Sequence, residues 1–154
     1  MSNYEFSPKQ LLLLKNFDCS VDICEGSVRS SKTFTLIIKY FLKVRASKGV
    51  GGINVIAAFD KPAFEKILLP EIRMLFPEIV YKTLGVGGAQ IQWEGEIIYI
   101  GAYGTREKFK KLLGSTIKNL YITEVNLIPH LEYLHKLLDR MGSVDNFYFA
   151  GDLN

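Results

Sequence analysis

The sequence has few features that would cross-link a chain or anchor it in a bilayer. It contains 2 cysteines among 154 residues, too few for a small secreted fold held together by disulfides. Apolar runs such as Leu11–Leu14 fall far short of the ~20 residues that a membrane-spanning helix needs. The first residues, Met1 to Phe6, have neither the basic segment nor the apolar core of a signal peptide. We therefore expect a soluble intracellular protein with reduced thiols.

Repeats, low-complexity tracts and a strong excess of charge are also missing. Hydrophobic residues make up 48% of the chain, charged residues 23% and aromatic residues 12%. These values are typical of a globular protein and exclude a disordered chain, a collagen and a coiled coil. The length fits one domain with a sizeable core. The formal net charge of +3 is compatible with a nucleotide or nucleic-acid partner but does not argue for one.

Segments with helical spacing of apolar residues alternate with short apolar runs. Ser7 followed by Pro8 is a typical helix start, and this order of strands and helices is typical of an α/β domain with a mainly parallel sheet. We predict helices over residues 8–16, 33–45, 62–76 (interrupted at Pro70), 105–113 and 130–141, strands over residues 21–24, 53–58, 119–122 and 147–150, and a hairpin that pairs residues 90–93 with 97–100.

A phosphate-binding loop is predicted between the first strand and the second helix. The spacing Gly26-x-x-x-x-Ser31-Lys32-Thr33 matches the P-loop pattern except that Ser31 stands where a glycine is usual. Backbone N–H groups of such a loop and the N-terminus of the following helix bind phosphate oxygens. Lys32 would reach the β- and γ-phosphates, and the Thr33 hydroxyl would bind Mg²⁺. The residues predicted to hold the phosphates are Gly26, Ser27, Val28, Arg29, Ser30, Ser31, Lys32 and Thr33.

The second half of a nucleotide-hydrolysing site is predicted at the end of the strand over residues 119–122. There an apolar run leads into Thr123 and Glu124. Most such sites carry an aspartate and then a glutamate, which bind Mg²⁺ and orient the attacking water. We expect Glu124 to orient water and Thr123 to interact weakly with the metal. The alternative is that Glu124 is an ordinary surface carboxylate.

Two further features have more than one interpretation. The helix over residues 105–113 carries Arg106 and three lysines around Phe109. It either contacts a DNA backbone or presents a solvated charged face. Asp22, which is unusual within a strand, is interpreted as a cap or as a partner of Lys32 before nucleotide binds.

Several motifs resemble those of the large terminase subunits of tailed bacteriophages, the motors that package viral DNA. The loop with Arg29 inside it resembles the family's phosphate loop, and Tyr121 to Pro129 resembles its acidic strand motif. Residues 101–114 are similar to the segment before that strand. Residues 6–10 resemble the adenine-recognising motif, and residues 149–154 resemble the coupling motif. The resemblance covers nearly the whole chain in the family's motif order.

The resemblance implies a P-loop NTPase three-layer sandwich that hydrolyses ATP with Mg²⁺. It implies that Lys32 and Thr33 bind ATP and Mg²⁺, that Glu124 is catalytic, and that Arg29 acts on the γ-phosphate of its own subunit. It further implies that Gln10 contacts adenine and that Asn154 couples hydrolysis to movement. The implied partners are double-stranded DNA, the portal protein of the procapsid, the small terminase subunit and further copies in a ring, without a membrane, in the bacterial host cytoplasm.

The sequence departs from the family at three points. Ser31 replaces a glycine, Thr123 replaces the aspartate associated with Mg²⁺, and the chain stops at Asn154 where family members continue into further strands and a nuclease domain. We therefore expect a single ATPase domain over residues 1–154 without the nuclease. A catalytically weak or inactive fragment that binds nucleotide or assembles with partners is the alternative. A small P-loop kinase is disfavoured because no arginine-rich lid is found.

Overall fold

The computed structural model describes residues 4–27 and 31–153. Its strands are β1 (Val21–Glu25), β2 (Ile53–Ala58), β3 (Val80–Leu84), β4 (Gly88–Trp93), β5 (Glu96–Ala102), β6 (Ile117–Ile122) and β7 (Tyr148–Leu153). Its helices are α1 (Pro8–Lys15), α2 (Lys32–Ala46), α3 (Lys61–Ala63), α4 (Leu69–Leu75), α5 (Arg106–Leu113) and α6 (Leu131–Met141). A π-helical segment (Phe64–Leu68) joins α3 to α4, and a 3₁₀ turn (Val125–Leu127) follows β6.

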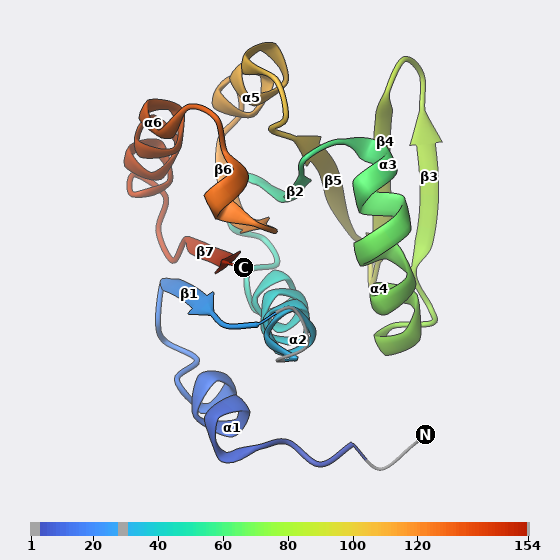
Figure 1. Cartoon of the computed structure of the whole chain (residues 1–154), viewed down its shortest axis with the longest axis vertical. Coiled ribbons are helices and arrows are strands. Elements are labelled where there is room, and N and C mark those ends of the chain that lie inside the picture. Colours follow the sequence, from blue (N-terminus) through green and yellow to red (C-terminus); the bar gives the residue numbers. More distant parts are fainter. Residues whose placement is uncertain (1–3, 28–30, 154) are drawn as a thin grey trace.

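The described strands form one seven-stranded sheet in the order β1-β7-β6-β2-β5-β4-β3 (Figure 1). The first five strands in this order are parallel, and β4 and β3 are antiparallel at the other edge. The expected α/β fold with a mainly parallel sheet is therefore confirmed. In a parallel sheet the carboxyl ends of all strands lie at one end of the sheet, so the last residues of β1, β6 and β7 are brought together there.

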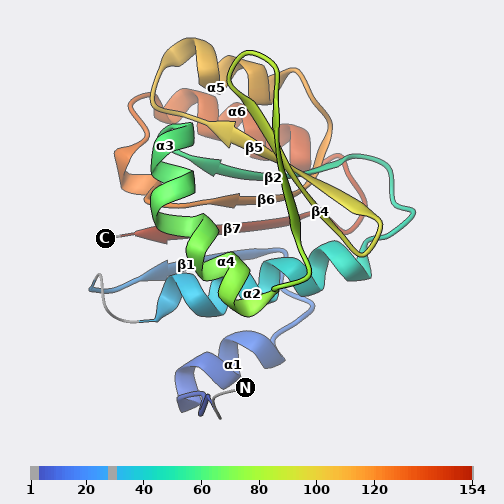
Figure 2. The same ribbon diagram turned by 90° about the vertical axis from the view of Figure 1, so that its right-hand side faces the viewer.

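Helices cover both faces of the sheet and make three layers (Figure 2). Side chains alternate along β2, because Ile56 and Ala58 pack in the core with α2 and α4, whereas Val55 and Ala57 pack with α5 and α6. Every residue of β6 is buried, which explains the apolar run from Leu120 to Ile122. None of the helices in the described part of the chain has the length and apolar character to cross a membrane.

The predicted break at Pro70 takes the form of a π-helical segment just before α4. Pro70 has no N–H to donate, and the backbone before it is accommodated by π-helical bonding, in which the Leu69 N–H donates to the Phe64 carbonyl. The helical stretch over residues 61–75 is therefore continuous, with a wider turn at Phe64–Leu68 in place of an interruption. Asp60 caps its start by accepting a hydrogen bond of 2.8 Å from the Ala63 N–H.

The sequence predicts the β4–β5 hairpin but not the β3–β4 hairpin. The β4–β5 hairpin is confirmed, and its turn residues Glu94 and Gly95 have φ values of 49° and 81°, as a type I′ turn requires. Strand β3 was not predicted. Its side chains are mostly exposed at the sheet edge, so no buried face gives its sequence a period of two. Residues 85–87 form the turn between β3 and β4.

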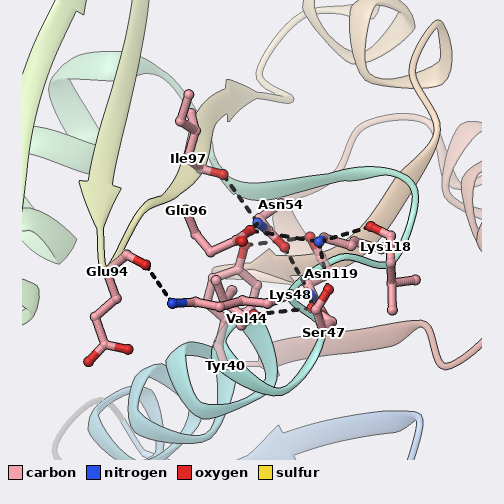
Figure 3. Close-up of polar contacts among 11 residues, drawn as sticks. Tyr40, Val44, Ser47, Lys48, Asn54, Glu94, Glu96, Ile97, Lys118 and Asn119 are labelled. Carbon is pink, nitrogen blue, oxygen red and sulfur yellow. Dashed lines mark hydrogen bonds and ion pairs between the residues drawn. The ribbon is translucent and has the colours of Figure 1, made fainter.

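A buried polar network joins strands β2 and β6 to the C-terminus of α2, at the end of the sheet opposite the carboxyl ends (Figure 3). The Asn119 amide donates to Ser47 Oγ at 2.7 Å and to Asn54 Oδ1 at 2.8 Å. Lys118 Nζ donates to the Ser47 carbonyl at 2.8 Å and lies 3.7 Å from Glu96 Oε2. Nearly every polar group here has a partner, so the network fixes the register of the central strands without losing much solvation energy.

A buried ion pair fastens α2 to the sheet edge. Lys39 Nζ lies 2.5 Å from Asp22 Oδ2 and also donates to the Asn16 carbonyl at 2.9 Å. Tyr148 OH donates to the same Asp22 oxygen at 2.8 Å. The interpretation of Asp22 as a partner of Lys32 is therefore wrong, since Asp22 pairs with a lysine two turns further along the helix. Burial and the Asp22 charge raise the pKa of Tyr148.

We predict that Asp22→Asn lowers the free energy of unfolding by about 3–5 kcal/mol, because it leaves the Lys39 ammonium buried without its counter-charge. Thermal denaturation followed by circular dichroism measures this as a Tm lowered by roughly 10 °C. Glu132→Gln is the matched control, since Glu132 pairs with His130 at an exposed site where such a pair contributes about 0–1 kcal/mol. Equal effects of the two substitutions would contradict the prediction.

Candidate nucleotide-binding site

The phosphate loop leaves the carboxyl end of β1 and enters α2 at Lys32. The Lys32 ammonium turns back over the loop and donates to the Gly26 carbonyl at 2.5 Å and to the Ser27 carbonyl at 3.2 Å. Its side chain is buried. The loop thus keeps a lysine amine at the N-terminus of a long helix, where backbone N–H groups and the helix dipole favour an anion.

Ser31 precedes α2 in a left-handed conformation, with φ 56° and ψ 15°. This geometry explains why glycine is usual at this position, because a Cβ in the left-handed region costs roughly 1–2 kcal/mol. The Ser31 carbonyl accepts from the Thr35 N–H at 3.1 Å and from Thr35 Oγ1 at 3.1 Å. These two hydrogen bonds to the Ser31 carbonyl stabilise the left-handed backbone conformation at the start of α2.

Asp152 on β7 connects the two halves of the site. It is 1% exposed. Its Oδ2 accepts from Thr33 Oγ1 at 3.3 Å and from Tyr121 OH. Its Oδ1 accepts from the Glu124 N–H at 2.7 Å and from Thr123 Oγ1 at 3.4 Å. One carboxylate thus joins the first turn of α2 to the end of β6.

Glu124 is also held in a left-handed conformation, with φ 54° and ψ 53°. Tyr103 OH donates to the Thr123 carbonyl at 2.6 Å and to the Glu124 carbonyl at 3.2 Å. Together with the bond from its N–H to Asp152, these contacts fix the Glu124 backbone on both sides. A non-glycine residue persists in such a conformation when its surroundings over-determine it, which is frequent at functional sites.

The tyrosines and the thiol around Asp152 are neutral at ordinary pH. Burial, followed by the Asp152 charge, raises the pKa of Tyr121 well above its usual value. Burial and the charges of Glu124 and Asp152 raise the pKa of Tyr103. Burial, with Asp22 and Asp152, raises the pKa of the Cys24 thiol, which is free. These groups therefore act as neutral hydrogen-bond donors and packing groups in the site.

Gln10 lies beside the first turn of α2. Its Nε2 donates to Thr35 Oγ1 at 2.9 Å and to Tyr4 OH at 2.9 Å, and its Oε1 accepts from the Ser7 N–H at 2.8 Å. The Tyr4 ring packs on Phe34, with ring centres 4.4 Å apart. The chain therefore places Gln10 next to the helix that follows the phosphate loop. Its contact with adenine stays a prediction.

The sequence-predicted site residues divide into three groups. Thr33, Thr123 and Glu124 are brought together through Asp152, with Lys32 and Ser31 at the adjoining loop. Gln10, on α1, contacts Thr35 in the first turn of α2. Val28, Arg29, Ser30 and Asn154 lie outside the described residues. Sequence reasoning assigned no role of its own to Asp152, although a carboxylate at the end of an apolar strand was the same signal that singled out Glu124.

The basic helix α5 has its charged residues on the surface and its aromatic residue inside. Arg106 and Lys108 are exposed, whereas Phe109 is buried and packs on Tyr133, with ring centres 5.8 Å apart. Phe109 is therefore a core residue, and contact between α5 and DNA stays a prediction. A cavity of about 700 Å³ between α5 and the strands β2 and β5 includes none of the predicted nucleotide-binding residues.

Comparison with solved structures identifies the fold as that of phage large-terminase ATPase domains. The large terminase from a thermophilic bacteriophage superposes with a TM-score of 0.78 at 20% identity, over 98% of this chain and 39% of that one. That protein has also been solved with ADP and with ATP-γ-S. The N-terminal domain of the DNA packaging ATPase from bacteriophage phi29 superposes with a TM-score of 0.60 at 13% identity, over 96% of this chain and 78% of that one.

The large-terminase ATPase domain of Thermus phage P74-26 superposes with a TM-score of 0.62 at 13% identity, over 97% of this chain and 65% of that one. No protein-family model matches the sequence, and no curated protein matches it. This chain therefore has the mixed α/β fold of large-terminase ATPase domains, and it spans 39% of the length of the first of these terminases.

We predict that Ser31→Gly raises the free energy of unfolding by up to about 1 kcal/mol, because glycine adopts the left-handed conformation without a Cβ penalty. Chemical denaturation measures the change. Ala63→Gly in the helical stretch before α4 is the control, because Ala63 has a negative φ of −62° and no polar side chain, so glycine there lowers stability through the backbone alone. A destabilised Ser31→Gly variant would show that the serine side chain makes a contact worth more than the strain.

Proposed function

We propose that this chain is the ATP-binding and ATP-hydrolysing domain of a large terminase, a motor that drives viral double-stranded DNA into a procapsid. The observation that carries the proposal is the convergence on Asp152, where the Thr33 hydroxyl of the phosphate loop and the Glu124 backbone at the end of β6 bind the same carboxylate. A phosphate loop alone would be a weak argument. A phosphate loop joined to a second strand end with a glutamate is what hydrolysis of a nucleotide requires.

Each residue has a definite task in the proposed reaction. The Lys32 ammonium moves from the loop carbonyls of Gly26 and Ser27 to the phosphate tail, and the backbone N–H groups at the start of α2 bind phosphate oxygens. The Glu124 carboxylate accepts a hydrogen bond from the attacking water and orients it in line with the γ-phosphate. Arg29 is proposed to stabilise the γ-phosphate in the same subunit, and Gln10 to contact adenine.

The residues present fit a magnesium ion. A threonine hydroxyl beside a buried carboxylate is a set of hard oxygen donors, which Mg²⁺ prefers. One carboxylate oxygen of Glu71 is buried without a hydrogen-bond partner among the described residues, and burial and the Asp152 charge raise the Glu71 pKa. When bound, Mg²⁺ neutralises charge on the phosphates. In this chain Thr33 would hold it, with Thr123 interacting weakly.

The partners follow from the same proposal. The fold is shared with a protein described as a DNA packaging ATPase, which supports double-stranded DNA as the partner of the motor. The portal protein of the procapsid, the small terminase subunit and further copies in a ring are proposed partners in the host cytoplasm. The exposed lysines of α5 are a surface suited to a phosphate backbone.

The second candidate is a fragment that binds nucleotide with weak or no turnover. Thr123 favours it, because a hydroxyl brings no negative charge to the position where an aspartate is usual. Steady-state hydrolysis separates the two functions, since the motor domain depends on Glu124 and the binding fragment does not.

We predict that Lys32→Ala weakens ATP binding by about 10–100-fold, since a charge-assisted hydrogen bond contributes about 1.5–3 kcal/mol. Isothermal titration calorimetry with ATP-γ-S and Mg²⁺ measures the loss. Lys110→Ala, an exposed lysine on α5, is the control and leaves affinity unchanged. Absence of nucleotide binding by the unaltered chain at millimolar ATP would end the proposal.

We predict that Glu124→Gln keeps ATP affinity within about threefold but lowers the hydrolysis rate by roughly 10²–10⁴-fold, the range for loss of a group that positions or deprotonates a nucleophile. Phosphate release, measured with and without double-stranded DNA, gives the rate. Glu107→Gln on α5 is the matched control, because it removes an exposed carboxylate outside the site. A rate unchanged by Glu124→Gln would support the binding fragment.

A further inference from the structure

Asp152 is a buried carboxylate without a matching positive charge. Its hydrogen-bond partners in the described part of the chain are all neutral: three side-chain hydroxyls, from Thr33, Tyr121 and Thr123, and the Glu124 N–H. No ion pair to Asp152 is found among residues 4–27 and 31–153. Burial of a charge is costly unless an ion of opposite charge or a metal compensates it. The site therefore calls for a cation close to the Thr33 hydroxyl.

Asp152 lies next to position 123, where an aspartate is usual in nucleotide-hydrolysing sites and this chain has a threonine. β6 and β7 are adjacent and parallel, with Ile122 opposite Gly151, so the next residues, Thr123 and Asp152, lie side by side at the carboxyl ends of the two strands. Gly151 leaves room for the segment that follows β6, because a Cβ there would lie 2.6 Å from Val125 Cγ2. The carboxylate absent at Thr123 is thus present one strand away, at the same height on the sheet.

The chemistry of the site favours Mg²⁺ on a nucleotide over a self-contained metal centre. Within the described residues, no group of three His, Cys, Asp or Glu side chains is arranged to hold a metal by itself. Mg²⁺ keeps several waters and binds through one or two carboxylates together with substrate phosphates. One buried carboxylate, a threonine hydroxyl and a phosphate tail meet that requirement.

We propose that Asp152 is the magnesium-binding carboxylate of this site, acting directly or through a metal-bound water, in the role that an aspartate at position 123 would otherwise have. The inference rests on the proposed function, because the phosphates of the nucleotide provide the other ligands. Asp152 then has two connected tasks: it helps Thr33 to hold the cation, and it fixes the Glu124 backbone through the 2.7 Å hydrogen bond.

The test measures binding of ATP-γ-S to the full chain by calorimetry, with Mg²⁺ and with EDTA. For the unaltered chain, Mg²⁺ tightens binding by about tenfold or more. Asp152→Asn keeps the shape of the side chain but reduces the affinity of the nucleotide complex for the metal by roughly 10–100-fold. Most of the increase in ATP-γ-S affinity that Mg²⁺ gives is therefore lost, whereas the ATP-γ-S affinity in EDTA stays within about twofold. Asp139→Asn, on the exposed side of α6, is the matched control and keeps the gain.

A second variant moves the carboxylate to the neighbouring strand. The double substitution Thr123→Asp with Asp152→Asn restores one negative charge at the site, and we expect it to regain most of the Mg²⁺ dependence that Asp152→Asn loses. Full Mg²⁺ dependence in a folded Asp152→Asn variant would overturn the inference. No nucleotide binding by the unaltered chain, with or without Mg²⁺, would instead overturn the proposed function.

If Asp152→Asn does not fold, the unaltered chain provides the test. Mn²⁺ replaces Mg²⁺ in the ATP-γ-S complex of protein labelled with ¹³C at the aspartate carboxyl groups, and pulsed electron paramagnetic resonance detects nearby labelled carbons. A hyperfine coupling from a carboxyl carbon in the first or second coordination shell supports the inference. Its absence, with Mn²⁺ bound, overturns it.

Discussion

The site depends on one buried carboxylate placed between two strand ends. The parallel arrangement of β1, β7 and β6 brings the carboxyl ends of three strands to one end of the sheet, but it does not by itself fix the side chains there. Asp152 does so, because its two oxygens accept from α2, from β6 and from the turn after β6. The orientation of Glu124 and the position of the first turn of α2 are therefore set by the same group.

The two ends of the sheet have opposite characters. At the carboxyl ends, Ser31 and Glu124 are held in left-handed conformations, and Asp152 is buried without an ion-pair partner in the described residues. At the other end, Asn54, Lys118 and Asn119 have nearly all their hydrogen bonds satisfied (Figure 3). Backbone strain thus lies at one end of the sheet and a nearly complete hydrogen-bond network at the other, an arrangement that is frequent around functional sites.

Most of the fold was predictable from the sequence because its signals are local. Ser7 and Gln10 form the capping box at the start of α1, and β2 has the predicted bounds. The failures involve contacts that no local sequence pattern indicates. Asp22 pairs with Lys39 rather than Lys32, and β3 is recognisable only once it pairs with β4. In the site, the spacing of residues in the sequence predicts the phosphate loop and singles out Glu124. The contacts of Asp152 cannot be predicted in this way, because they depend on β7 lying beside β6 and on a hydrogen bond to Thr33, 119 residues earlier in the chain.

The register of β6 and β7 also changes the meaning of Thr123. Considered alone, Thr123 is the loss of an acid from a catalytic site. Beside Asp152 it is the complementary residue, because its hydroxyl donates to Asp152 Oδ1 at 3.4 Å. A second carboxylate at the same place would repel the first and force one of them to take up a proton. One carboxylate and one hydroxyl are hydrogen-bonded across the ends of the two strands, so the threonine that follows β6 complements the aspartate on β7.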